Sequence, residues 1–237
     1  MNTISSFTGQ IPLALDPQQQ PGFDLFVAGA NHSACENVKK IAAGILKSNL
    51  YLWGSTGTGV THLLQAACKQ AAEQGRQTAY IPLSEHAALD PGMLENMEAL
   101  DLVCMDDIDQ IGGEQDWEQA LLHLYNRRRD SEQPMLIGAH TGPQSLNFHL
   151  PDLKSRMSWD LVYHLQALSD ADKIDLLQRR AAARSFSLPR DVAEYLVKRV
   201  RRDLPYLVSV MNRLEQATLV EQRKLTIPFV KTLLQIE

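Results

Sequence analysis

The sequence predicts an α/β fold, a three-layer αβα sandwich built on a parallel sheet and followed by a small all-α lid. Three observations support this prediction. Strand-like apolar runs alternate with helical patterns from Phe23 to about Gln166, a glycine-rich loop joins the first run to a helical pattern, and strand signals stop at Ser169. Such alternation is typical of doubly wound parallel sheets with helices on both faces.

Five apolar runs have the length and composition of buried parallel strands. They are Leu50–Trp53, Thr78–Leu83, Leu100–Met105, Met135–Ala139 and Leu161–Leu165. The helical patterns that precede or separate them lie near Asn31–Lys47, Thr61–Gln74, Pro91–Ala99, Asp116–Arg129 and Leu150–Trp159.

The lid is predicted from the helical patterns that follow the last strand. Ser169 resembles an N-cap with the acidic Asp172 at the third helical position, and Thr226 caps a last short helix. We therefore divide the chain into a tail of residues 1–22, an α/β domain of residues 23–166 and a helical lid of residues 167–237.

Composition narrows the class of protein. The chain is 44% hydrophobic with a net charge of −5 and shows neither a bilayer-spanning run nor a signal peptide, so we expect a cytoplasmic protein without a membrane partner. Its three cysteines lack metal-ligand spacing and are interpreted as buried thiols. The net negative charge argues against a protein whose main role is to bind DNA, because DNA binding needs a basic surface.

The loop after the first strand is a phosphate-binding loop that lacks its lysine. The pattern G-x-x-x-x-G-K-[ST] is met by Gly54, Ser55, Thr56, Gly57, Thr58, Gly59 and Thr61, while Val60 stands at the lysine position. Backbone N–H groups at a helix N-terminus can still hold a diphosphate. Because the lysine ammonium group is missing, the sequence predicts a site that binds a nucleotide without hydrolysing it efficiently.

An apolar strand that ends in two carboxylates predicts a Walker B element. Asp106 and Asp107 follow this strand, and the chemistry needs one carboxylate for the magnesium shell and one to orient water. Thr61 and Asp106 are the candidate ligands of a Mg²⁺ ion that is bound together with the nucleotide. Alone, such an acidic pair is more often the solvated end of a strand. Together with the phosphate-binding loop, it is more often a Walker B element.

Other polar positions are candidates for phosphate contacts. His140 or Thr141, after the strand Met135–Ala139, can lie beside a γ-phosphate, although a lone histidine has many other uses. Arg156 can act as a finger on a neighbour's nucleotide, yet out of context it is more often a solvated helix-end arginine. Arg202 opens the third lid helix and can reach back to the phosphates.

Together these motifs resemble the DnaA-related branch of the AAA+ ATPases. The resemblance is to the ATPase domain of the replication initiator DnaA and more closely to the short Hda family, the regulatory inactivators of DnaA. It runs from about Phe23 to the C-terminus and is carried by Phe23–Val27 with Gly29 and Asn31, Tyr51–Gly54, Thr61–Leu64, Val103–Asp107, Leu153–Arg156, Arg202–Leu204 and Asn212–Leu214.

The resemblance implies a role for each matching position. Phe26, Val27 and Asn31 would lie near the base, Gly54–Thr61 would hold the phosphates, and Asp106 and Asp107 would be the Walker B carboxylates. His140 would be sensor I, Arg202 sensor II, and Arg156 the arginine finger that acts in trans.

Three positions depart from the family pattern. Val60 replaces the lysine, Asp107 stands where AAA+ proteins usually have glutamate, and His140 replaces an acidic residue of the initiator. A charge-assisted contact is worth about 1.5–3 kcal/mol. We therefore expect binding of a nucleoside diphosphate, ADP before others, with or without Mg²⁺, and poor hydrolysis in cis.

Two features favour the regulator over the initiator. The chain ends after the lid, so we expect no helix-turn-helix domain for reading DNA. In the tail, Gln10, Ile11, Leu13 and Leu15 resemble a peptide that docks in an apolar groove of the DNA polymerase III sliding clamp, its β subunit.

The resemblance thus implies a negative regulator of replication initiation. It would bind DnaA and the clamp, contact DNA and the nucleoid only through the clamp, and promote hydrolysis of DnaA-bound ATP with little turnover of its own. Self-association through AAA+ faces is a further expectation. The alternative is an autonomous P-loop NTPase of the helicase-loader type, which predicts ATPase activity from this chain alone.

Overall fold

Five parallel strands form the sheet of this computed structural model, which describes residues 22–201, 203–221 and 223–235. Their order is β2-β3-β4-β1-β5, and all neighbours pair in parallel. The strands are β1 (Leu50–Trp53), β2 (Thr78–Pro82), β3 (Leu102–Asp106), β4 (Met135–Ala139) and β5 (Leu161–His164). The predicted α/β class with a parallel sheet is confirmed.

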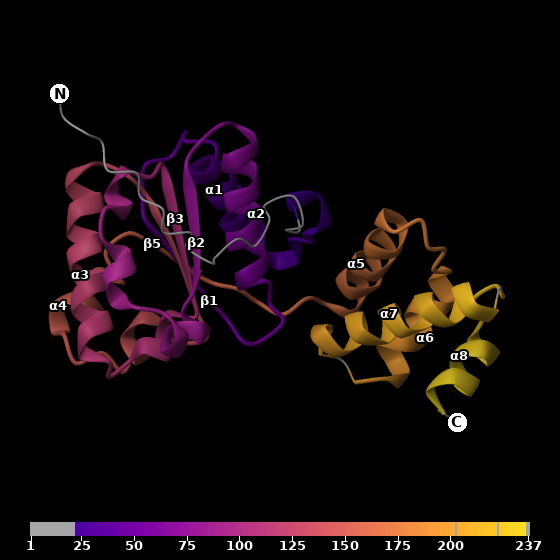
Figure 1. Ribbon diagram of the computed structural model, residues 1–237. Helices are drawn as coiled ribbons and strands as arrows, with labels where there is room; N and C mark the ends of the chain where they lie inside the picture. Colours follow the sequence, from indigo (N-terminus) through magenta and orange to yellow (C-terminus); the bar gives the residue numbers. More distant parts are fainter. Residues whose placement is uncertain (1–21, 202, 222, 236–237) are drawn as a thin grey trace.

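Helices cover both faces of the sheet (Figure 1). Helices α1 (His32–Ala42) and α2 (Val60–Glu73) pack on one face, and α3 (Gln115–Asp130) and α4 (Pro151–Arg156) pack on the other. The inner strands β1, β3 and β4 are buried on both faces, as expected for a parallel sheet. The edge strands β2 and β5 are only partly buried, so the prediction of five buried strands is wrong for these two. Leu102 and Cys104 of β3 join the core beside α1 and α2, whereas Val103 and Met105 join the core beside α3.

Four helices follow the sheet and have an apolar core of their own (Figure 1). They are α5 (Asp170–Ala183), α6 (Arg190–Arg199), α7 (Leu204–Glu221) and α8 (Ile227–Leu234). The predicted caps are confirmed: Ser169 and Asp172 form a capping box, and the Thr226 side chain accepts a hydrogen bond from the Phe229 N–H. None of the helices in the described part of the chain is long and apolar enough to span a bilayer.

One predicted helix is wrong, and others are shorter than predicted. Residues 91–99 form two short 3₁₀ helices, because Asn96 adopts a left-handed backbone (φ 64°) and the Asp90 side chain accepts the Gly92 N–H. Helix α1 ends at Ala42, just before Gly44 with φ 72°. The 3₁₀ helices are η2 (Phe23–Leu25), η3 (Gly29–Asn31), η4 (Leu83–Ala88), η5 (Pro91–Leu94), η6 (Met97–Ala99), η7 (Ile108–Ile111) and η8 (Pro143–Ser145).

The topology brings the polar strand ends together. Strands β1, β3 and β4 are adjacent and parallel, so their carboxyl ends meet at one edge of the sheet. In open α/β sheets this edge is where ligands bind. The glycine-rich loop, the acidic pair and His140 therefore meet there.

Candidate nucleotide site

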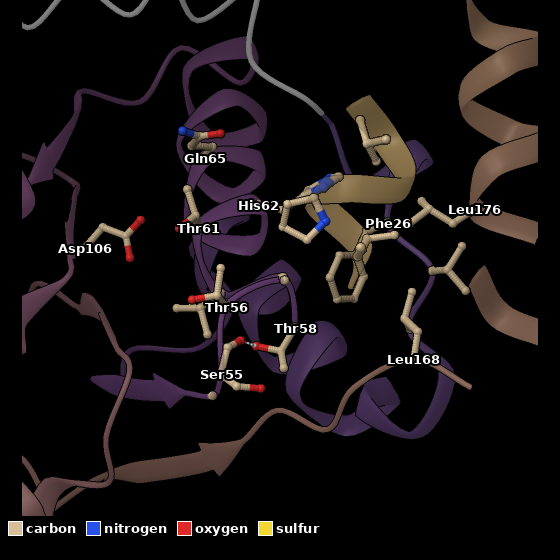
Figure 2. A pocket seen from close by; sticks show the side chains of 18 of the residues that line it. Phe26, Ser55, Thr56, Thr58, Thr61, His62, Gln65, Asp106, Leu168 and Leu176 are labelled. Carbon is tan, nitrogen blue, oxygen red and sulfur yellow. Dashed lines mark hydrogen bonds between the residues drawn. The ribbon is translucent and has the colours of Figure 1, made fainter. Parts of the chain in front are cut away.

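The loop between β1 and α2 has the conformation of a phosphate cradle. Gly57 and Gly59 adopt φ values of 88° and 101°, which favour glycine. The Thr58 backbone N–H and hydroxyl both donate to the Ser55 carbonyl, at 3.1 and 2.8 Å, which closes the loop (Figure 2). The first N–H groups of α2 then point out of the helix without helical partners, as an anion site requires.

Val60, at the lysine position, is a core residue rather than an exposed replacement. Its side chain is only 8% exposed and belongs to the apolar core of α1 and α2. It packs toward Gly138 of β4, where an added Cβ would lie 2.8 Å from Val60 Cγ1. The loop therefore supplies backbone donors but no cation at this position.

Asp106 is buried at the end of β3 and is held by three donors. The Tyr80 hydroxyl donates to Oδ2 at 2.8 Å, the Asp107 N–H donates to Oδ1 at 3.1 Å, and the Thr61 hydroxyl is a further partner. Burial raises the pKa of Asp106, and the hydroxyl of Thr61 opposes that shift. The approach of Asp106 depends on Gly138, since a Cβ there would lie 2.5 Å from Oδ1.

The second carboxylate points to a different neighbour. Asp107 adopts a left-handed backbone (φ 57°), and its Oδ1 lies 3.5 Å from Nδ1 of His140. The same imidazole nitrogen lies 3.5 Å from Oδ2 of Asp109. The other carboxylate oxygen of Asp109, Oδ1, accepts a hydrogen bond from the backbone N–H of His140 at 2.9 Å. His140 is thus fixed at the cavity edge between two carboxylates. Thr141, the other candidate after β4, is not among the residues that line the cavity.

A cavity of about 350 Å³ joins these groups to an apolar compartment. Phe26 and Val27, which the family resemblance places near a nucleotide base, line it, and the Phe26 ring meets the His62 ring edge-on at 5.4 Å between centroids. Figure 2 shows Phe26, Leu168 and Leu176 on one side of the cavity and Asp106 on the other. A planar apolar group can therefore lie beside Phe26 while its phosphates reach the loop.

The lid contributes to the cavity in a way that sequence reasoning missed. Leu204 and Pro205, at the start of α7, line the cavity and lie against Gly57, where a Cβ would meet Pro205 Cδ at 2.9 Å. Other lining residues that were not predicted are Leu25, His62, Gln65, Ala139, Leu168, Leu176, Arg180 and Val208. The helical spacing of Leu176 and Arg180 was visible in the sequence, but nothing there showed which face of α5 meets the loop.

Asn31, expected near the base, does not line the cavity. Its buried side-chain amide donates to the Gln166 carbonyl at 2.9 Å and accepts the Gln166 N–H at 2.8 Å. It therefore ties the segment before α1 to the connection between β5 and the lid. This bidentate pairing positions the wall formed by Phe26 and Val27.

Arg156 lies apart from this cavity. Its guanidinium carbon is 5.7 Å from the centroid of the Tyr125 ring and 5.1 Å from that of Trp159, and Figure 1 shows α4 on the side of the sheet away from the lid. Its Nε and Nη1 are buried without hydrogen-bond partners among the described residues. Two aromatic faces thus hold the group that was predicted as the finger.

Two sets of predicted residues lie outside the described part of the chain. These are Arg202, expected as sensor II, and the clamp-binding positions Gln10, Ile11, Leu13 and Leu15. The residues at the start of α7 that line the cavity are Leu204, Pro205 and Val208, all apolar.

Comparison with known proteins places the chain in a family. A family model of the bacterial DnaA ATPase domain matches residues 17–164, and a model of the Hda lid domain matches residues 170–234. The two matches cover the sheet domain and the helical lid in turn.

Solved structures show the same fold at low sequence identity. Domain III of the Thermotoga maritima replication initiation protein DnaA is 22% identical, with a TM-score of 0.79 over 94% of this chain and 98% of that one. AMPPCP-bound DnaA from Aquifex aeolicus is 22% identical, with a TM-score of 0.66 over 77% of this chain and 60% of that one. The Thermotoga maritima RuvB Holliday junction branch migration motor is 18% identical, with a TM-score of 0.64 over 85% and 68%.

The cavity geometry and the matched families agree. A glycine-rich loop, a buried strand-end carboxylate and an adjacent helical lid are the parts of an AAA+ nucleotide site, and the family models match the regions that contain them. The chain belongs to the bacterial DnaA ATPase-domain family and is an Hda-like, DnaA-homologous AAA+ protein.

Proposed function

We propose that this protein is a negative regulator of replication initiation that binds the DNA-loaded sliding clamp and promotes hydrolysis of the ATP held by DnaA. The observation that carries the proposal is a complete phosphate cradle with a buried valine at the lysine position. Such a site is suited to holding a nucleotide as part of the structure. The Hda-like lid supports a role directed at DnaA.

The bound ligand is a nucleoside diphosphate, with ADP as the first candidate. The loop N–H groups hold its phosphates, and the compartment beside Phe26 encloses its base. Because Leu176, Leu204 and Pro205 line the same cavity from the lid, the nucleotide contacts both parts of the protein. Its binding would fix the angle between the sheet domain and the lid.

The Thr61 hydroxyl and the Asp106 carboxylate fit a Mg²⁺ ion that accompanies the phosphates. Both are oxygen donors, which Mg²⁺ prefers, and they already lie in hydrogen-bond contact. No cluster of three or more His, Cys, Asp or Glu that could hold a metal occurs in the described ranges, so the remaining ligands would come from phosphate and water. When bound, Mg²⁺ would neutralise phosphate charge.

Two features make hydrolysis in cis poor. An apolar side chain at position 60 leaves the β- and γ-phosphates without the cation that stabilises negative charge during phosphoryl transfer. Asp107, the carboxylate expected to orient water, lies beside His140 in a left-handed backbone conformation. We therefore assign little turnover to this chain alone.

Arg156 is the residue assigned to act in trans. It lies outside its own nucleotide cavity, and two of its guanidinium nitrogens are desolvated and unpaired among the described residues. Cation–π contacts with the Tyr125 and Trp159 rings restrain the guanidinium, which lowers the entropy lost on docking. At a shared AAA+ interface it would stabilise the charge that develops on the partner's ATP.

The clamp gives the regulator its location. A tail peptide with spaced aliphatic side chains docks in an apolar groove, and tethering to DNA-loaded clamp raises the local concentration of the regulator around DnaA. The sequence of residues 10–15 supports this part of the proposal. DNA is then contacted only indirectly.

The test measures single-turnover hydrolysis of ATP pre-bound to DnaA, in the presence of clamp loaded on DNA. We expect Arg156→Ala to lower the rate about 10³-fold or more, the range seen for arginine fingers. Lys154→Ala, which removes a cation from the same helix, is the matched control and should keep the wild-type rate. Equal rates for Arg156→Ala and wild type would remove Arg156 from this role.

Two further measurements separate the parts of the proposal. Deletion of residues 1–20 should abolish clamp binding and leave nucleotide binding unchanged; an unchanged affinity for the clamp would eliminate the tail peptide. Steady-state ATPase activity of the purified chain should be negligible. Brisk turnover without DnaA would favour the autonomous NTPase instead.

A further inference from the structure

Trp159 is an exposed tryptophan beside the arginine that is assigned to act in trans. It follows α4 and is 55% exposed, whereas Trp117 is buried in the core and Trp53 is half-buried. Single exposed apolar side chains are common on protein surfaces, so exposure alone indicates little. The contacts of Trp159 distinguish it from an ordinary exposed side chain.

The Trp159 indole is held in one orientation although much of it is exposed. Its Nε1–H donates to the Ser155 hydroxyl at 3.1 Å. The guanidinium carbon of Arg156 lies 5.1 Å from the ring centroid, and that of Arg129 lies 5.8 Å from it. A side chain that is already restrained loses less conformational entropy when a partner covers it. The indole is therefore preorganised for docking.

The exposed surface continues from Trp159 onto the edge strand β5. Val162 pairs in register with Tyr51, which belongs to the core beside α3, so the Val162 side chain lies on the α3 side of the sheet. His164 lies on the same side, where its ring stacks on that of Trp53 at 3.9 Å between centroids. Val162 is 38% exposed and His164 is also exposed. This end of β5 is thus left uncovered by the short helix α4.

The charge beside the indole indicates the kind of partner that covers it. Nε and Nη1 of Arg156 are buried without hydrogen-bond partners among the described residues. Desolvated donors without acceptors are unfavourable, and the role in trans assigned to Arg156 provides acceptors in the phosphates of a partner's ATP. Because the Trp159 ring contacts the same guanidinium, a partner that reaches Arg156 also covers Trp159.

We propose that Trp159 is the apolar docking residue with which this protein binds the ATP-bound AAA+ partner; this inference rests on the role in trans assigned to Arg156 above. Tryptophan and arginine are the residue types that most often dominate the energy of an interface. The indole enters an apolar recess of the partner, and Val162 extends the apolar contact along β5. Trp159 then determines the affinity for the partner, while Arg156 determines the rate of hydrolysis.

The experiment measures affinity and rate separately. Surface plasmon resonance gives the affinity of the full chain for immobilised DnaA loaded with AMPPCP, which is not hydrolysed. We expect Trp159→Ala to weaken binding roughly 30-fold or more, equivalent to about 2 kcal/mol. In single-turnover hydrolysis of DnaA-bound ATP at saturating chain concentration, with clamp loaded on DNA, its rate should stay within about threefold of wild type. Arg156→Ala should instead lose most of that rate.

Two variants control for exposure and for the aromatic ring. Leu219→Ala removes another exposed apolar side chain (72%), on α7, and should bind the partner within about twofold of wild type. Trp159→Phe keeps an aromatic face and loses the Nε1–H, so it should weaken binding less than Trp159→Ala.

Folding of Trp159→Ala is checked on the free protein. Its thermal unfolding midpoint should lie within about 4 °C of wild type, because the cation–π contacts of an exposed ring contribute little stability. Its affinity for ADP should be unchanged, since Trp159 does not line the nucleotide cavity.

The outcomes separate this inference from the proposed function. An unchanged affinity of Trp159→Ala for AMPPCP-bound DnaA would overturn the docking role, and so would a loss of rate at unchanged affinity. Neither result affects the test of Arg156. If wild type binds AMPPCP-bound DnaA through Trp159 and yet does not stimulate hydrolysis, the proposed function fails and the docking role stands. Absence of wild-type binding would overturn both.

Discussion

Gly138 on β4 occupies the most crowded position behind the nucleotide site, and replacing it by alanine is a demanding test of how β4 packs against its neighbours. An added Cβ would lie 2.5 Å from Asp106 Oδ1, 2.7 Å from Leu64 Cδ1 and 2.8 Å from Val60 Cγ1. All three distances are shorter than ordinary carbon contacts of about 3.5–4.0 Å. The strand, the Walker B carboxylate and the first turn of α2 would have to move apart.

The magnitude follows from this geometry. Overpacking a close-packed core costs about 1–3 kcal/mol, and for a chain of this length each kcal/mol shifts the unfolding midpoint by about 2–4 °C. We therefore expect Gly138→Ala to lower the midpoint by about 2–12 °C in thermal unfolding followed by circular dichroism. Affinity for ADP should fall as well, since Asp106 and Val60 both line the cavity.

Gly142, four residues further along, is the matched control. Its backbone is extended (φ −65°, ψ 155°), and an added Cβ would lie no closer than 3.5 Å to Trp53. Gly142→Ala should therefore be neutral within about 0.5 kcal/mol. In Gly138→Ala, a second change of Val60→Ala should restore part of the lost stability, because it removes one of the clashing atoms. A midpoint of Gly138→Ala equal to that of wild type would refute the close packing of β4 against α2.

Two other predictions concern the charges of the site. Burial raises the pKa of Asp106 above its ordinary 3.8. The folded state therefore binds the proton more tightly than the unfolded state does. As a result, the free energy of unfolding of the ligand-free protein falls as the pH rises through the folded pKa. Asp106→Asn should thus raise the ligand-free unfolding midpoint at pH 7. This gain should vanish at about pH 3, where the carboxyl is protonated in both the folded and the unfolded state. A gain that persists at pH 3 would contradict a raised pKa of Asp106 in the folded state. Val60→Lys should raise the affinity for ADP about tenfold and cost about 1.5–3 kcal/mol of folding stability through lost apolar burial. Calorimetry and thermal unfolding measure the two effects, and an unchanged affinity would show that the missing cation does not limit phosphate binding.

Much of the scaffold was predictable because its signals are local. Apolar runs such as Leu50–Trp53 and Met135–Ala139 form strands whose bounds match the prediction. The glycines of the loop and the cap at Ser169 also act within a few residues of the chain. Where local signals competed, as at Gly92 and Asn96, two short 3₁₀ helices formed in place of the predicted helix.

The sequence by itself determined the order of strands and helices, the phosphate-binding loop and the polar residues at the strand ends, because these depend on periodicity and backbone preference over short stretches. Only the tertiary structure decided that Tyr80 donates to Asp106, that Arg156 contacts two aromatic rings, and that Leu204 and Pro205 lie against the loop. It also placed Arg180 in the cavity. Apart from the Arg156–Trp159 contact, these contacts join residues far apart in the chain. They depend on how the strands, helices and lid pack, which no short stretch of sequence encodes.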